Sequence, residues 1–225
     1  MTATLGPDLM SFIRNAWYPA AWSADVAAEP LARTFLGEEV VLYRASAGQP
    51  VALANACPHR FAALAKGKLH GDSIACPYHG LQFGTDGRCT HNPHGPATGA
   101  MRVRSYPLCE RNGMIWIWMG DPARADEANV MPLSAVDDPE LDWISGYLHV
   151  EGNYQLVIDN LLDLTHVEFM HPFLADPTDT FPTDVACFEE GEDIVSRYTR
   201  EQSNTSRLVS ALWPDAPSVT SLLSE

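Results

Sequence analysis

The chain has 225 residues, of which 46% are hydrophobic, and its 29 acidic residues outnumber 14 basic ones for a net charge of −15. This length supports one large domain or two modest ones, and the composition excludes a disordered, collagen-like or disulfide-rich small protein. The negative charge argues against nucleic acid and anionic membranes as partners. Residues 1–110 hold nine Lys and Arg against eight Asp and Glu, so the excess of acid lies in the second half. We therefore expect two parts.

The sequence also indicates a compartment. No apolar run approaches the roughly 20 residues that span a bilayer, and the N-terminus lacks a basic stretch leading into an apolar one. The cysteines are odd in number, at positions 57, 76, 89, 109 and 187. In a reducing compartment they are free thiols or metal ligands rather than disulfides. We expect a cytoplasmic protein without a membrane segment.

The first half reads as an all-β module. Runs rich in β-branched and aromatic residues predict strands, at 40–44, 51–55, 73–80, 81–89 and 114–120. Asp86-Gly87 predicts a tight hairpin turn, and we expect Trp116 and Trp118 to lie in the core. Residues 121–142 are acidic and contain several prolines, so we place the boundary between the two domains there.

The second half begins with a predicted helix. From Tyr154 to His171 the chain has neither Gly nor Pro, and its apolar residues recur at helical spacing. Asn153 is the expected N-cap, and Pro172 ends the run. Further along, three segments predict strands, at 194–201, 207–213 and 218–224.

A first metal site is predicted from two short motifs. Cys57-Pro58-His59 and Cys76-Pro77-Tyr78-His79 each supply one thiolate and one imidazole, with sixteen residues between the motifs. A Rieske two-iron two-sulfur centre takes two cysteines on one iron and two histidines on the other. Structural zinc takes the same set, but zinc fingers pair cysteine with cysteine and histidine with histidine. The alternating order therefore favours the Rieske cluster.

A second metal site is predicted on the helix, where Asp163, His166 and His171 follow one another. Asp163 and His166 are three residues apart and share a helical face, whereas five residues separate the histidines by about 140°. If both histidines bind one metal, the helix must end or distort between them. Two histidines and a carboxylate form the facial triad of non-haem Fe(II) oxygenases. The alternative is a solvated Asp163 beside ordinary histidines.

The remaining histidines and cysteines carry no predicted metal. Cys89, Cys109 and Cys187 are expected to be small buried apolar residues. His91 and His94 are expected to be solvated loop residues, and His70 and His149 have no partner at a ligand spacing.

The motifs, together with residues 12–22, 103–122 and 153–171, resemble the oxygenase components of the vanillate O-demethylase family, which includes dicamba demethylase and toluenesulfonate methyl-monooxygenase. The resemblance spans about residues 12–175. It implies an α+β fold, with an all-β Rieske domain in residues 1–121. The N-terminal portion of a helix-grip (START-like) catalytic domain would fill residues 122–225.

The resemblance also implies roles for single residues. Cys57, His59, Cys76 and His79 would hold the cluster, while His166 and His171 would bind a mononuclear Fe(II). In a homotrimer, Asp163 would bridge His79 of one subunit to His166 of the next, and Asn160 would lie close to the iron. In this family the carboxylate ligand comes much later, whereas the sequence has 54 residues after His171. We expect an incomplete catalytic domain, because Asp176, Asp179 and Asp184 match nothing in the family pattern.

The implied activity is that of a Rieske monooxygenase. A reductase with a flavin and a ferredoxin-type cluster would pass electrons from NAD(P)H, and O2 would hydroxylate or O-demethylate a vanillate-like aromatic acid. Hydroxylation of a methoxy group gives a hemiacetal that collapses to a phenol and formaldehyde. The alternatives are a Rieske electron carrier and an inactive fragment without mononuclear iron.

Overall fold

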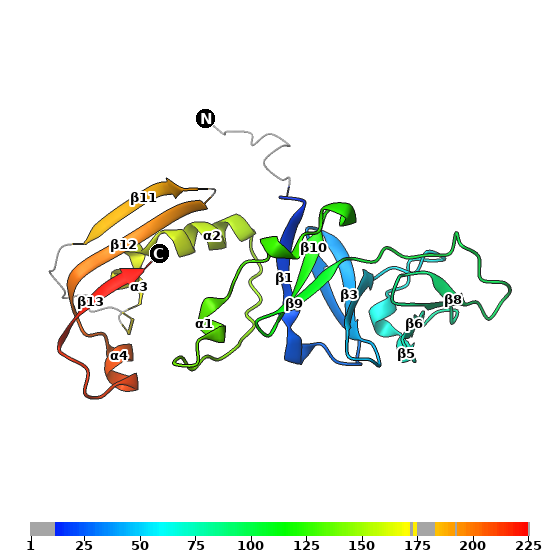
Figure 1. The fold of residues 1–225 in the computed structure, drawn as a ribbon, viewed down its shortest axis with the longest axis horizontal. Helices are drawn as coiled ribbons and strands as arrows, with labels where there is room; N and C mark the ends of the chain where they lie inside the picture. The colour runs from blue at the N-terminus through cyan, green and yellow to red at the C-terminus, as the bar shows by residue number, and fades with distance from the viewer. Residues whose placement is uncertain (1–11, 172, 175–182, 192, 225) are drawn as a thin grey trace. The chain divides into compact units, whose positions relative to one another are not determined.

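The computed structural model describes residues 12–171, 173–174, 183–191 and 193–224. The chain forms two compact units, residues 1–146 and residues 147–225 (Figure 1). Strands dominate the first unit, and the second combines a three-stranded sheet with short helices, which confirms the predicted α+β class. Within the described ranges, no helix combines the length and the apolar character needed to cross a membrane.

The first unit consists of three antiparallel sheets. In the order of their hydrogen-bonded neighbours, they are β1 (Ala16–Trp22), β10 (Met114–Met119) and β9 (Leu108–Arg111); β2 (Leu31–Phe35), β3 (Glu38–Arg44) and β4 (Pro50–Ala54); and β5 (Lys68–His70), β6 (Ser73–Ala75), β7 (Gln82–Phe83) and β8 (Cys89–His91). The predicted all-β module is confirmed. The predicted strand at 73–80 is wrong beyond Ala75, because the chain turns away there into a loop that contains Cys76 and His79.

The strand predicted at 81–89 is wrong as one strand, because a turn at the predicted Asp86-Gly87 divides it into β7 and β8. Gly87 has φ +78° in the turn between β7 and β8, and a Cβ there would lie 2.2 Å from the Val103 carbonyl oxygen. Only glycine fits this turn. Trp116 and Trp118 on β10 are each 4% exposed, as expected for a strand that lies between two others and is covered on both faces.

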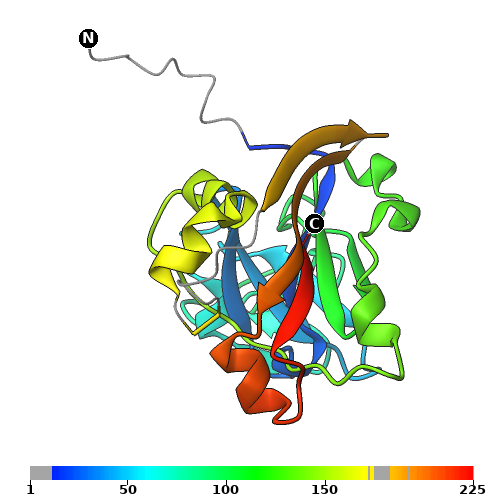
Figure 2. The ribbon, with the colours of Figure 1, turned by 90° about the vertical axis from the view of Figure 1, so that its left-hand side faces the viewer.

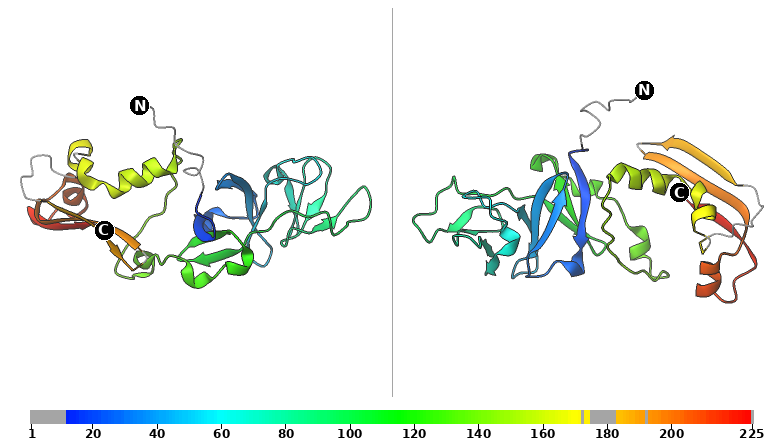
Figure 3. Two further views of the ribbon diagram at one scale, coloured as in Figure 1. Left: turned by 90° about the horizontal axis from the view of Figure 1, so that it is seen from above. Right: turned by 180° about the vertical axis from the view of Figure 1, so that it is seen from behind.

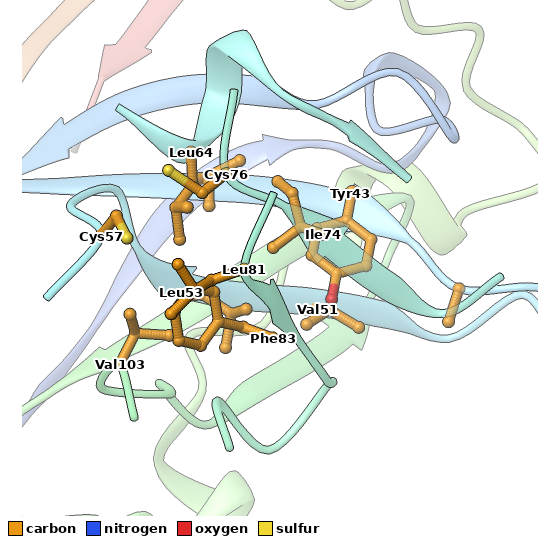
Figure 4. Close-up of a cluster of buried hydrophobic side chains, with 12 residues drawn as sticks. Tyr43, Val51, Leu53, Cys57, Leu64, Ile74, Cys76, Leu81, Phe83 and Val103 are labelled. Atoms are coloured by element: carbon orange, nitrogen blue, oxygen red, sulfur yellow. The ribbon is translucent and has the colours of Figure 1, made fainter. Parts of the chain in front are cut away.

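One hydrophobic cluster joins the four-stranded sheet to β3 and β4. Tyr43 and Leu53 meet Phe83 in this cluster, and all three are fully buried. Figure 4 shows that Cys57 and Cys76 belong to the same cluster. The core of the first unit therefore fixes the starting points of the two loops that contain the predicted cluster ligands.

Residues 121–146, which we call the connecting segment, pack on the first unit. Three indole N–H groups donate to its backbone: Trp118 to the Asp121 carbonyl at 2.8 Å, Trp17 to Asp126 at 2.8 Å and Trp22 to Gly146 at 3.0 Å. The Trp22 ring also stacks on Trp143 with centroids 5.7 Å apart. The segment includes the single turn α1 (Ser134–Asp137). The prediction assigned residues 122–146 to the second domain, whereas these contacts lie in the first unit.

The second unit contains α2 (Tyr154–Leu162), the 3₁₀ turn η6 (Leu164–His166), α3 (Val167–Met170) and a three-stranded antiparallel sheet of β11 (Asp184–Glu190), β12 (Asp193–Asn204) and β13 (Val219–Ser224) (Figure 2). The strands predicted at 194–201 and 218–224 are confirmed. The Ser196 hydroxyl donates to the Leu162 carbonyl at 2.9 Å, which ties the end of α2 to the sheet.

The strand predicted at 207–213 is wrong. This segment forms the helix α4 (Arg207–Leu212) in the connection from β12 to β13 (Figure 3). The Ser206 hydroxyl accepts the Val209 N–H at 3.2 Å. A serine at the N-cap starts a helix, and this local signal outweighs the strand-like composition.

Candidate metal centres

The two cysteine–histidine motifs form loops with the same backbone pattern. We call residues 57–62 the first ligand loop and residues 76–81 the second. In each loop the cysteine N–H donates to the carbonyl five residues later, Cys57 to Ala62 at 3.0 Å and Cys76 to Leu81 at 2.7 Å. These bonds hold each loop closed, so its cysteine and histidine stay on one side.

The fifth position of each loop has a left-handed backbone. Phe61 has φ +56° and Gly80 has φ +75°. Each donates its N–H back to the cysteine carbonyl of its loop, at 2.8 Å and 3.1 Å. Glycine adopts this conformation without strain, whereas a phenylalanine there is unusual. The positive φ, rather than lack of space alone, explains why the second loop has a glycine.

The two thiols lie side by side at the buried end of the loops. Cys57 is 1% and Cys76 is 4% exposed, and both are free. Burial raises the pKa of the Cys57 thiol, and the neighbouring Cys76 thiol raises it further, although backbone N–H groups of His59 and Arg60 act in the opposite direction. Two apposed thiols are suited to a cationic ligand, which binds the thiolate form.

The two imidazoles face each other at the outer end. The His59 and His79 ring centroids are 4.6 Å apart. Nδ1 of His79 is buried and has no hydrogen-bond partner among the described residues. Burial lowers the pKa of His79, and the neighbouring His59, His94 and Arg60 lower it further. A neutral imidazole whose buried nitrogen has no hydrogen-bond partner can bind a metal ion through that nitrogen.

This arrangement fits a two-iron two-sulfur cluster better than zinc. Zinc needs four donors that converge on one point. Within the part of the chain that the structure describes, no three His, Cys, Asp or Glu side chains converge in this way. A Rieske cluster spreads its ligands over two irons, two on each, which matches paired thiols at one end and paired imidazoles at the other.

A cavity of about 590 Å³ opens beside the two imidazoles. It is lined by Pro58, His59, His79, Leu81, Asn92, His94, Thr98, Ala100 and Met101. His94 is exposed in a loop, as expected, and in addition its Nε2 lies 3.1 Å from the His79 carbonyl oxygen. The Asn92 side chain accepts the His94 N–H at 3.0 Å. The sequence signal for this turn was the Asn-Pro-His triplet.

The second predicted metal site lies where α2 ends. The Asn153 side chain accepts the Gln155 N–H at 3.0 Å, so the predicted N-cap is confirmed. The helix stops at Leu162 rather than continuing to His171. Asp163 has φ −102° and ψ 91°, and its carboxylate accepts the Thr165 N–H at 3.0 Å as the N-cap of η6. The prediction that Asp163 and His166 share a face of one helix is therefore wrong.

This break brings the two histidines together. The His166 and His171 ring centroids are 5.5 Å apart, and His171 lies just outside α3. Nδ1 of His166 donates to the Asp163 carbonyl, which leaves the Nε2 lone pair for a metal. The Asn160 amide nitrogen is 3.5 Å from that Nε2. Residues 160, 163, 166 and 171 thus gather at one place, as the sequence suggested.

The aspartates considered as metal ligands lie in different parts of the chain. Hydrogen bonds from the Thr165 hydroxyl and N–H lower the pKa of Asp163, and the nearby His166 lowers it further. Asp184 is exposed at the start of β11, and Asp176 and Asp179 lie outside the described residues. No third donor joins His166 and His171 within the described ranges.

Cysteines outside the ligand loops differ from expectation. Cys109 is buried and Cys89 is partly buried, but Cys187 on β11 is exposed. The prediction of three buried thiols is wrong for Cys187, since alternate residues of an outer strand face opposite sides.

Two known domain families match the chain, one in each compact unit. Residues 16–107 match the Rieske [2Fe-2S] domain, and residues 150–221 match the vanillate O-demethylase oxygenase C-terminal domain. The first unit is therefore a Rieske iron–sulfur domain.

Individual proteins similar to the chain indicate which kind of Rieske protein it resembles. The chain is 46% identical to the oxygenase component of dicamba O-demethylase from Stenotrophomonas maltophilia over 164 residues, 72% of this chain and 48% of that protein. The crystal structure of dicamba monooxygenase bound to 3,6-dichlorosalicylic acid superposes with a TM-score of 0.88 at 36% identity, covering 95% of this chain and 63% of that one. The structure of dicamba monooxygenase with non-heme iron and dicamba gives 0.72 at 38% identity, covering 85% and 54%.

The chain thus combines a Rieske domain with a domain of the vanillate O-demethylase C-terminal type, and the relatives it matches are oxygenase components of aromatic demethylases and monooxygenases. It spans about half the length of the curated relatives it matches.

Proposed function

We propose that the chain provides the cluster domain and two iron-binding histidines of the terminal oxygenase in a multicomponent monooxygenase. One observation carries the proposal: two buried thiols and two facing imidazoles lie on paired ligand loops. Downstream of them, His166 and His171 approach each other. The non-heme iron in a structural relative supports mononuclear iron at these histidines.

When bound, the cluster would supply single electrons and the Fe(II) would activate O2. This chain's residues hold and orient those groups. Cys57, Cys76, His59 and His79 would hold the cluster, and the hydrogen bond from Nδ1 of His166 fixes the tautomer that presents Nε2. Asn160, beside that Nε2, would contact the ligand sphere of the iron.

Asp163 would connect the two centres in a homotrimer. Its Oδ1 accepts the hydrogen bonds from Thr165, which leaves the other oxygen for an imidazole N–H of a neighbouring subunit. Because its pKa is lowered, the carboxylate is ionised at neutral pH and remains an acceptor. In this proposal it bridges His79 of one subunit to His166 of the next.

The proposed substrate is a methoxylated aromatic acid similar to vanillate or dicamba. The methoxy group, O2, two electrons and two protons give a phenol, formaldehyde and water, so one oxygen atom enters the methyl group and the other leaves as water. The electrons come from NAD(P)H through a reductase with a flavin and a ferredoxin-type cluster. We place this system in the cytoplasm, where thiols stay reduced, in keeping with five free cysteines.

The test is the iron and acid-labile sulfide content of the purified protein, with an EPR spectrum of the reduced form. We expect a Rieske spectrum and one iron beyond those of the cluster. His79→Ala should remove the spectrum, whereas His70→Ala, at an exposed position on β5, should leave it unchanged. Zinc without a Rieske spectrum would overturn the proposal.

Asp163→Asn tests the bridge. We expect both iron signals to remain and turnover to fall by orders of magnitude in a preparation that is active before substitution. Thr165→Val is the matched variant, since it removes one hydrogen bond to Asp163 and leaves the carboxylate in place. Full turnover in the Asp163→Asn protein would refute the bridging role.

A second candidate function is a Rieske electron carrier without mononuclear iron. It is favoured by the absence of a third donor beside His166 and His171 among the described residues. The same measurement separates the two functions, because a carrier has cluster iron only.

A further inference from the structure

The two ligand loops are held in place by different contacts. After the first loop, the Asn55 side chain accepts the Ala65 N–H at 2.7 Å. Asn55 is 5% exposed, and the adjacent Leu64 is fully buried. The first loop is thus held from inside the core.

The second loop is held from outside, by the turn at residues 92–96. Nε2 of His94 lies 3.1 Å from the His79 carbonyl oxygen. A carbonyl can only accept, so Nε2 carries the proton and donates it. The Pro93 ring lies against Gly80, where a Cβ would come within 3.4 Å of Cγ. The turn therefore contacts the ligand residue and the glycine that follows it.

The turn is itself well ordered by hydrogen bonds. The Asn92 side chain accepts the His94 N–H at 3.0 Å and donates to the Pro96 carbonyl at 3.3 Å. The loop that contains this turn is closed at its ends, where the Cys89 N–H donates to the Met101 carbonyl at 2.9 Å. These hydrogen bonds hold His94 against the second loop. Its hydrogen bond to His79 is therefore part of the folded structure.

We propose that His94 is a positioning residue for the cluster, which fixes the His79 backbone and sets both how firmly the cluster is held and its reduction potential. Hydrogen bonds and solvent access around the ligands tune the potential of such clusters. His94 donates to the ligand residue and also forms one wall of the cavity beside the imidazoles, and we assign the effect to the hydrogen bond. The inference rests on the Rieske cluster of the proposed function.

Three substitutions separate these contributions. His94→Ala removes the donor and the wall, His94→Phe keeps a wall without a donor, and His94→Gln keeps an N–H at a similar reach. We expect release of cluster iron to a chelator to become about tenfold faster in the Ala and Phe proteins. Their midpoint potential should fall, because a lost donor no longer stabilises the added electron. The Gln protein should resemble the wild type in both measurements.

The control is His91→Ala, which removes an exposed histidine three residues earlier. It should change neither iron release nor potential. If His94→Phe matches the wild type in both measurements while the wild type shows a Rieske spectrum, this inference is wrong and the proposed function stands. If the wild type itself shows no Rieske spectrum, the cluster assignment fails, and the role of His94 fails with it.

Discussion

The two compact units bury their apolar side chains to very different extents. The first has three hydrophobic clusters that include most of its strands. In the second, Tyr198 and Arg200 are the buried residues among those described. Helix α2 has no buried residue, and Leu156 and Leu161 on it are 67% and 65% exposed. Helix α2 therefore leaves its apolar side chains uncovered by the described part of the chain.

The difference bears on the two metal centres. The cysteines of the first centre are part of a core that the unit closes by itself. The histidines of the second centre are held by local hydrogen bonds at the ends of short helices. We therefore expect the first centre to form from this unit alone, whereas the second depends on what covers α2 and α3.

Two phenylalanines test this comparison with the largest expected effect. Phe83 is fully buried in the first unit and Phe169 is 81% exposed in the second. Phe83→Ala should lower the free energy of unfolding by about 3–5 kcal/mol, since it leaves a cavity. Phe169→Ala should change it by less than about 0.5 kcal/mol. Denaturant unfolding followed by tryptophan fluorescence measures both, and equal losses would contradict the contrast.

An ion pair in the first unit gives a smaller effect that depends on pH. Arg44 donates to both Glu110 oxygens, at 3.0 Å and 2.8 Å, and this hydrogen bonding lowers the pKa of Glu110. Glu110→Gln should cost about 1 kcal/mol at pH 7, because the Glu110 side chain is 37% exposed and water screens the pair.

The sign of the pH effect follows from the lowered pKa. The ionised Glu110 stabilises the folded state at pH values above its ordinary pKa of 4.5, and this stabilisation is lost as the pH falls through the lowered value. The wild type and Glu110→Gln should therefore converge in acid when unfolding is measured against pH. Glu39→Gln, at an exposed position on β3, is the control and should follow the wild type throughout.

The smallest predicted effect concerns the start of α2. Asn153→Ala removes the side chain that accepts the Gln155 N–H and should destabilise the helix by about 0.5–1 kcal/mol. Faster hydrogen exchange at residues 154–162, with no change in β10, is the expected result. Gln155→Ala keeps the backbone donor and the cap, so exchange there should remain near the wild-type rate.

The two ligand loops were predictable from the sequence because their signal is local. The Cys-x-His and Cys-x-x-His spacings place both donors of each loop within one turn, and the backbone bonds of Cys57 and Cys76 need only their own loop. The strands at β3, β4 and β10 were also predictable, since composition and burial agree there.

The break at Asp163 was harder to predict. Leu164 and Val167 continue the helical spacing of apolar residues, so the pattern alone indicates one helix. The Asp163-x-Thr165 cap decides otherwise. His94 was missed for a different reason: its partner is a backbone carbonyl fifteen residues away, and a contact of that kind leaves no spacing to read.

The three indole hydrogen bonds to the connecting segment affect how the Rieske domain can be excised. A cut after Asp121 would leave the N–H groups of Trp17 and Trp22 without their acceptors. It would also uncover the cluster formed by Cys109, Trp116 and Val130. A fragment that ends at Gly146 keeps these contacts, and its emission spectrum would report directly whether the segment is docked, because five of the six tryptophans precede that residue.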